Sequence, residues 1–130
     1  MTLFSKLFGS GNGQSEDTPQ IPWKSLTSIA QLEDIIEESK TKTVAIFKHS
    51  TRCGISSMTL RRFEGDYDTD ITNVAPYYLD LLQFRDVSNE ISARFGVMHQ
   101  SPQLLVIKNG ETIHHASHYD IQAQTIINLA

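Results

Sequence analysis

The stretch TVAIFKHSTRCGIS, residues 43–56, decides the fold of this 130-residue chain. Its first five residues are β-branched or apolar without alternation, which is typical of a strand covered on both faces. A polar loop follows, and residues 53–63 then carry apolar side chains loosely on one side of a helix. A buried strand that leads into a helix predicts a sheet with parallel crossovers.

Patterns on either side of this stretch complete a mixed α/β order. Asn109-Gly110 is the strongest local signal, because this dipeptide favours the two-residue turn of a β-hairpin. The order resembles the thioredoxin fold, an α/β fold with a central mixed four-stranded sheet flanked by helices, here with an additional N-terminal helix. The predicted elements are a helix at 28–36, a strand at 43–47, a helix at 53–63, a strand at 74–82, a helix at 87–95, hairpin strands at 103–108 and 111–116, and a helix from Asp120 to Leu129.

Composition divides the chain into a tail and one domain. Residues 1–20 are predicted to form a flexible N-terminal tail, because residues 9–20 are polar and contain too few apolar groups to offset the entropy of ordering. Residues 21–130 are expected to form one thioredoxin-like domain. No apolar run approaches the length that a bilayer requires, so we expect no integral membrane segment.

Charge and cysteine content narrow the expected partners and compartment. The formal net charge of -4, with acidic and basic residues interspersed, offers no basic surface for nucleic acid. A single cysteine excludes an internal disulfide, so any disulfide of Cys53 is intermolecular. Together with the lack of a secretory signal pattern, it indicates a cytoplasmic protein. No exposed apolar stripe is evident beyond the tail, and we expect a monomer.

Cys53 is the candidate catalytic residue. It follows a buried strand and a short loop, which places it in the first turn of the next helix. The unpaired backbone donors and the dipole of a helix N-terminus stabilise an anion, and the thiolate is the nucleophilic form of cysteine. Lys48 and Arg52 could tune the thiol by adding positive charge. The alternative is a buried, inert cysteine.

Ser56 and Ser101-Pro102 are the other candidate site residues. Ser56 stands three residues after Cys53, where two-cysteine thioredoxins place the resolving thiol. Its hydroxyl can donate a hydrogen bond to a thiolate but cannot close a disulfide, so we expect monothiol chemistry. Ser56 could equally be an ordinary first-turn serine. The Ser101-Pro102 bond is expected to be cis, and Ser101 could then lend backbone groups to an extended substrate.

Five histidines raise the question of a metal site. His114 and His115 are adjacent in a predicted strand, so they point to opposite faces, and none of the five has a recognised zinc spacing with the lone cysteine. We therefore predict no metal site. His49 is close to Cys53 in sequence and could tune it, but solvent exposure is the commoner outcome.

Residues FKHSTRCGIS (47–56), with Ser101-Pro102-Gln103 and the hairpin, resemble the YtxJ-like monothiol bacilliredoxins over most of residues 21–130. The resemblance implies that Cys53 removes bacillithiol from bacillithiolated proteins and that other thiols clear the adduct. It also implies that Ser56 is the serine in the former resolving position and that Pro102 is the cis-proline. Gly54 departs from the family, which more often has proline after the cysteine.

Two alternatives stay open. Residues 52–56 also resemble the Cys-Gly-Phe-Ser signature of monothiol glutaredoxins, which bind a shared iron–sulfur cluster with glutathione, although residues 114–120 lack the Gly-Gly turn that holds glutathione. A non-catalytic interaction module would use the peptide groove of the fold and leave Cys53 inert. The favoured interpretation needs S-thiolated client proteins and a low-molecular-weight thiol as partners, and no cofactor beyond an adduct of that thiol.

Overall fold

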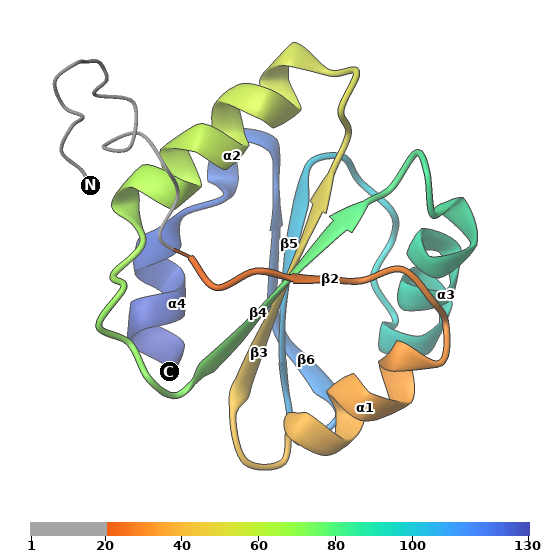
Figure 1. Ribbon diagram of the computed structural model, residues 1–130, viewed down its shortest axis with the longest axis vertical. Coiled ribbons are helices and arrows are strands. Elements are labelled where there is room, and N and C mark those ends of the chain that lie inside the picture. Colours follow the sequence, from red (N-terminus) through yellow and green to blue (C-terminus); the bar gives the residue numbers. More distant parts are fainter. Residues whose placement is uncertain (1–20) are drawn as a thin grey trace, which may run out of the picture.

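The structure is a computed structural model that describes residues 21–130, so the tail predicted at residues 1–20 lies outside the described residues. Five strands form one sheet in the order β2-β4-β3-β5-β6 (Figure 1). In chain order the elements are β2 (Lys24–Ser25), α1 (Gln31–Glu38), β3 (Thr43–His49), α2 (Gly54–Asp66), β4 (Val74–Asp80), α3 (Arg85–Phe95), β5 (Gln103–Lys108), β6 (Glu111–Ser117), the 3-10 turn η3 (His118–Asp120) and α4 (Ala123–Leu129).

The central strand of the sheet is β3. It pairs in parallel with β4 and antiparallel with β5, and the sheet is extended by β2, parallel to β4, and by β6, antiparallel to β5. At its carboxyl end, Lys48 lies opposite Gln103 on β5, and His49 lies opposite Asp80 on β4. In open α/β sheets, this edge is where ligands gather.

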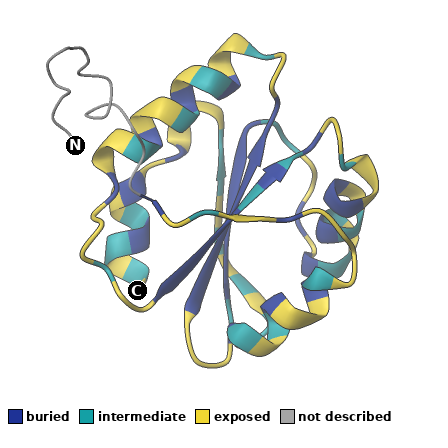
Figure 2. Ribbon diagram, viewed as in Figure 1, coloured by how far each residue is buried: buried dark blue, intermediate teal, exposed yellow. Residues whose placement is uncertain are grey.

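Helices cover both faces of the sheet, with α2 and α4 on one face and α1 and α3 on the other (Figure 1). Alternate side chains of β3 enter different layers. Val44 and Ile46 pack in the core with α1 and α3, whereas Ala45 and Phe47 pack in the core with α2 and α4. Every residue of β3 is buried (Figure 2), as the apolar pattern of residues 43–47 predicted for that part of the strand, and the burial extends to Lys48 and His49.

The hairpin predicted at Asn109-Gly110 is confirmed. Strands β5 and β6 flank this dipeptide, and Lys108 pairs with Glu111 across the turn. Asn109 and Gly110 have φ angles of 53° and 76°, and positive φ at both positions is the property of the turn that joins two twisted strands with two residues. The helix predicted at 87–95 also ends at Phe95, and Gly96 is its left-handed C-cap.

Three expectations about the architecture were wrong. The sheet has five strands rather than four, because the two exposed residues of β2 pair with Tyr77 and Tyr78 but are too few to show a period in the sequence. Helix α1 follows this strand, so it is not an N-terminal addition to the fold. Asp120 ends η3, and Gln122 is the N-cap of α4.

Within residues 21–130, no helix combines the length and the apolar character needed to cross a bilayer.

Candidate functional site

Cys53 is the N-cap residue of α2. Strand β3 ends at His49, and Cys53 follows a three-residue loop with an extended backbone, φ -112° and ψ 122°. Its N–H donates to the Ser50 carbonyl over 3.2 Å, and its own carbonyl accepts from the Ser57 N–H over 3.0 Å. The side chain is half-buried and free of disulfide. The sulfur therefore lies beside the first turn of α2, where backbone N–H groups have no partner within the helix.

Ser56 lies within this first turn and is fully buried. Its hydroxyl oxygen accepts a hydrogen bond from the Ser50 N–H over 3.0 Å and lies 2.8 Å from Nδ1 of His49. The expected hydrogen bond from Ser56 to the Cys53 sulfur is not among the contacts of the described residues. The hydroxyl is instead engaged with the end of β3, which orders the loop that carries the cysteine.

The burial of His49 differs from the expectation, although its possible role in tuning the thiol was considered. It was expected to be solvent-exposed, but its side chain is only 5% exposed and packs near the ring of Tyr78 at 5.7 Å between centroids. Burial lowers the pKa of His49, while the carboxylates of Asp80 and Glu64 raise it and offset part of this effect. The available signal was its position two residues after Phe47 in β3, which places both side chains on the α2 face.

Lys48 lies on the opposite face of the sheet from α2. Its ammonium is buried beneath α3, where it donates to the Ser88 carbonyl over 3.2 Å and to the Ser92 hydroxyl over 3.3 Å. Nδ1 of His99 is 3.4 Å from the same nitrogen. No carboxylate forms an ion pair with Lys48 in residues 21–130. Burial lowers the pKa of this lysine to about 8.

Arg52 and Gly54 flank Cys53 on the surface. Both are exposed, and Arg52 forms no ion pair with the described residues. A Cβ atom added at Gly54 would meet nothing within 4 Å. Because Gly54 is the first residue of α2, where proline is well tolerated, glycine is not required here by sterics.

Ser101 and Pro102 immediately precede β5, and the peptide bond between them is cis. Pro102 is buried, and its carbonyl accepts from the His118 N–H over 3.1 Å. The amide of Gln103 donates to the Met98 carbonyl over 3.0 Å. The Ser101 hydroxyl is buried without a hydrogen-bond partner in the described part of the chain. This segment is thus fixed from two sides and lies at the end of the strand beside β3.

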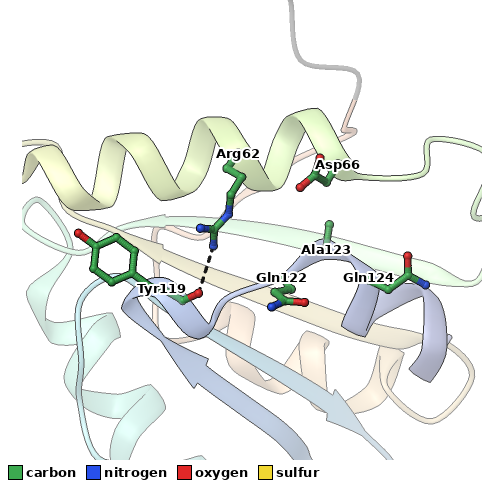
Figure 3. A pocket seen from close by; sticks show the side chains of 6 residues that line it. All are labelled: Arg62, Asp66, Tyr119, Gln122, Ala123 and Gln124. Carbon is green, nitrogen blue, oxygen red and sulfur yellow. Dashed lines mark hydrogen bonds between the residues drawn. The ribbon is translucent and has the colours of Figure 1, made fainter.

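The pocket in Figure 3 is distinct from the cysteine site. Arg62 donates to the backbone carbonyls of Tyr119 and Ile121, which ties α2 to the segment after β6. Arg62 is nine residues beyond Cys53, or about 13 Å along the helix axis. The pocket is lined by Arg62, Asp66, Tyr119, Gln122, Ala123 and Gln124.

Histidine, cysteine, aspartate and glutamate side chains form no cluster of three or more in residues 21–130 that could hold a metal ion. On the α2 face, His49 contacts Ser56, and the carboxylates of Asp80 and Glu64 act on the charge of the His49 ring.

Comparisons with known proteins agree with this geometry. A family model described as monothiol bacilliredoxin BrxC matches residues 24–126. The solved structure of a proposed oxidoreductase with a thioredoxin fold is 35% identical, covers 80% of this chain and 89% of its own, and gives a TM-score of 0.68. Thioredoxin from Fasciola hepatica is 19% identical, with 82% and 94% covered and a TM-score of 0.64. Thioredoxin from Malassezia sympodialis is also 19% identical, with 86% and 90% covered and a TM-score of 0.63. The two thioredoxins show the fold alone.

Proposed function

Because this chain belongs to the monothiol bacilliredoxin BrxC family and so has a thiol redox role, we propose that Cys53 removes a low-molecular-weight thiol of the bacillithiol kind from mixed disulfides on client proteins. The observation that carries the proposal is the single cysteine at the N-cap of α2, followed three residues later by a buried serine. A thiolate in this place faces the free backbone donors of the first turn.

The proposed reaction exchanges one disulfide for another. The Cys53 thiolate attacks the small-thiol sulfur of the mixed disulfide, an S–S bond forms to Cys53, and the client leaves as a thiolate that takes a proton from water. A second low-molecular-weight thiol then attacks the sulfur of the adduct. This step releases the Cys53 thiolate and a disulfide of two small thiols, so the co-reactant supplies the two electrons.

The serine at position 56 favours a one-cysteine route. A hydroxyl cannot form a disulfide, and the hydrogen bonds of Ser56 with Ser50 and His49 give it a structural task. The adduct on Cys53 therefore persists until an external thiol reaches it. Such a cycle needs a reducing compartment, in keeping with a cytoplasmic location.

The test uses a model protein that carries one S-bacillithiolated cysteine, with its S-glutathionylated form alongside. We expect the wild type to free the client and gain the mass of one small thiol, with bacillithiol transferred faster. Cys53→Ser should reduce the reaction to the uncatalysed rate. Ser57→Ala is the matched control, since the Ser57 side chain makes no hydrogen bond in the described chain, and it should retain the activity.

Four results would count against the proposal. Full activity of Cys53→Ser would show that Cys53 is not the nucleophile. Faster transfer of glutathione than of bacillithiol would show that the protein does not prefer a thiol of the bacillithiol kind. Visible absorption of an iron–sulfur cluster in anaerobically purified protein would favour cluster binding with glutathione. If Cys53 did not react with mixed disulfides, a non-catalytic interaction module would be the remaining interpretation.

A further inference from the structure

The hydrogen bond between His49 and Ser56 is a buried contact that the exchange reaction does not by itself require. Both side chains are at most 5% exposed, and Nδ1 of His49 lies 2.8 Å from the Ser56 hydroxyl oxygen. Ser56 is three residues after the N-cap Cys53. Residues at this spacing are neighbours on a helix, with about 5–6 Å between their Cβ atoms. The Ser56 hydroxyl is thus a group within the first turn that could turn toward the sulfur if its bond to His49 were lost.

The donors and acceptors around Ser56 define the direction of its hydroxyl. The Ser50 N–H can only donate, so the Ser56 oxygen accepts that bond at 3.0 Å. The hydroxyl proton is then free to point at Nδ1 of His49, provided that the neutral ring carries its own proton on Nε2. In this state the hydroxyl is turned away from Cys53, and all three groups have a partner.

Protonation of His49 reverses this bond. Nδ1 then carries a hydrogen and donates to the Ser56 oxygen, which also keeps the bond from Ser50. An oxygen that accepts two hydrogen bonds still has its own proton to donate, and Nδ1 can no longer receive it. Cys53 is three residues before Ser56, at the spacing of neighbours on a helix, so its sulfur is the acceptor toward which the released hydroxyl can turn. No covalent bond other than N–H forms or breaks in this change.

We propose that His49 is a positioning residue that sets the direction of the Ser56 hydroxyl: neutral His49 holds it away from Cys53, and protonated His49 releases it to donate to the thiolate. The inference rests on Cys53 being the reactive thiol of the proposed function. A thiolate that accepts this extra hydrogen bond is a weaker nucleophile, because part of its electron density is engaged. Acidification therefore slows exchange for a reason separate from the loss of thiolate.

The charged groups that face His49 influence the pH at which its ring gains a proton. On β4, Asp80 lies directly opposite and Tyr78 packs against the ring, while α2 contributes Glu64. Both carboxylates favour protonation of the imidazole, whereas burial opposes it more strongly, so the pKa of His49 is below its ordinary value. Glu64 also accepts a bond from the Trp23 indole over 2.9 Å, which holds its carboxylate in place.

The experiment measures the alkylation rate of Cys53 across the acid and neutral range, divided by the thiolate fraction from its ultraviolet absorbance. For the wild type we expect this normalised rate to fall about threefold to tenfold as His49 gains its proton, the effect of one net hydrogen bond. The ¹⁵N shifts of the His49 ring, followed by NMR in the same samples, should show Nε2–H at neutral pH and a midpoint that coincides with the fall.

Variants separate a positioning role from a structural one. His49→Asn presents an amide oxygen in place of Nδ1 and should stay in the fast state at every pH. His49→Leu offers no acceptor and should stay in the slow state. Ser56→Ala should abolish the step, and the double variant His49→Leu/Ser56→Ala should react like Ser56→Ala alone. Each variant is first checked for folding by its amide NMR spectrum, and His49→Asn provides the test if His49→Leu does not fold.

Several outcomes would overturn the inference. One is a normalised alkylation rate of the wild type that shows no fall with acidification, and another is the same fall in His49→Asn. A third is an NMR spectrum that places the ring proton on Nδ1 at neutral pH. The last is a His49→Leu change that slows alkylation as much in the Ser56→Ala background as in the wild type. Alkylation and NMR need no mixed-disulfide substrate. A protein that frees clients but shows no step thus refutes only this inference, and one that shows the step but frees no client refutes only the proposed function.

Discussion

Lys48 and His49 are consecutive residues at the end of β3, yet they belong to different halves of the molecule. The imidazole of His49 lies on the α2 face and contacts Ser56 in the first turn of the cysteine helix. The ammonium of Lys48 lies on the α3 face and contacts Ser88 and Ser92. Proximity to Cys53 in sequence made both candidates for tuning the thiol, but only His49 has a hydrogen-bonded path toward it.

The difference teaches that chain distance is a poor guide at the end of a central strand. Successive side chains of a strand point to opposite faces, so one residue step moves a group across the whole sheet. In β3 this step separates an imidazole that contacts Ser56 on α2 from a buried amine that contacts Ser88 and Ser92 on α3. The two sides can be tested independently.

The largest expected loss of stability comes from removing a buried ring from the core on the α2 face. Phe47 is fully buried there, with its ring 5.3 Å from Phe63 and 6.1 Å from Trp23 between centroids. Phe47→Ala should lower the free energy of unfolding by about 3–5 kcal/mol, because it leaves a cavity in a close-packed core. Urea denaturation measures this loss. Leu82→Ala, at a surface position, is the control and should change stability by about 0.5 kcal/mol or less; equal losses would contradict the assignment of Phe47 to this core.

On the α3 face, replacing the buried Lys48 should raise the free energy of unfolding rather than lower it. The pKa of Lys48 is about 8 in the folded protein against 10.5 as its ordinary value, so the buried ammonium costs stability at neutral pH. Lys48→Met should raise the free energy of unfolding at pH 7 by about 1–3 kcal/mol, because an unpaired buried charge gives way to an apolar chain of similar length.

The pH dependence of Lys48→Met has a defined sign. Between pH 8 and 10.5 the unfolded wild type binds a proton that the folded state lacks, so wild-type stability rises with pH and the advantage of the variant shrinks across this window. Urea denaturation at several pH values measures it, and Lys108→Met on the half-exposed end of β5 is the control. A variant less stable than the wild type at pH 7 would show that the contacts of the ammonium outweigh its burial.

The smallest expected changes in stability come from glycines at the carboxyl ends of α3 and α2. Gly96 ends α3 with φ 67°, so Gly96→Ala should lower the free energy of unfolding by about 1 kcal/mol. Gly65 lies within the last turn of α2, and an added Cβ there meets nothing within 4 Å. Gly65→Ala should raise stability by about 0.5–1 kcal/mol. Thermal denaturation distinguishes the signs, and two changes of the same sign would be inconsistent with these backbone conformations.

The sequence by itself determined the elements with strong local signals. The apolar run of β3, the Asn109-Gly110 turn and Gly96 after α3 each act through backbone preferences of a few neighbouring residues. Cys53 at the start of α2 follows from the same local order of strand, loop and helix. Since these preferences need no distant partner, the thioredoxin-like order and the position of the thiol could be predicted before the structure.

Only the tertiary structure decided how the surroundings of the thiol are divided. Strand β2 forms because β4 offers an edge to Lys24 and Ser25, and neither residue carries a strand signal of its own. The alternation of β3 puts Lys48 and His49 on opposite faces and His49 on the face of Phe47, but the sequence pattern does not reveal which helices cover each face. Ser56 likewise acquires its partner when α2 packs against the sheet. Each of these contacts joins groups whose relation depends on packing rather than on local backbone preference, which is why the contact between His49 and Ser56 became visible only in the folded molecule.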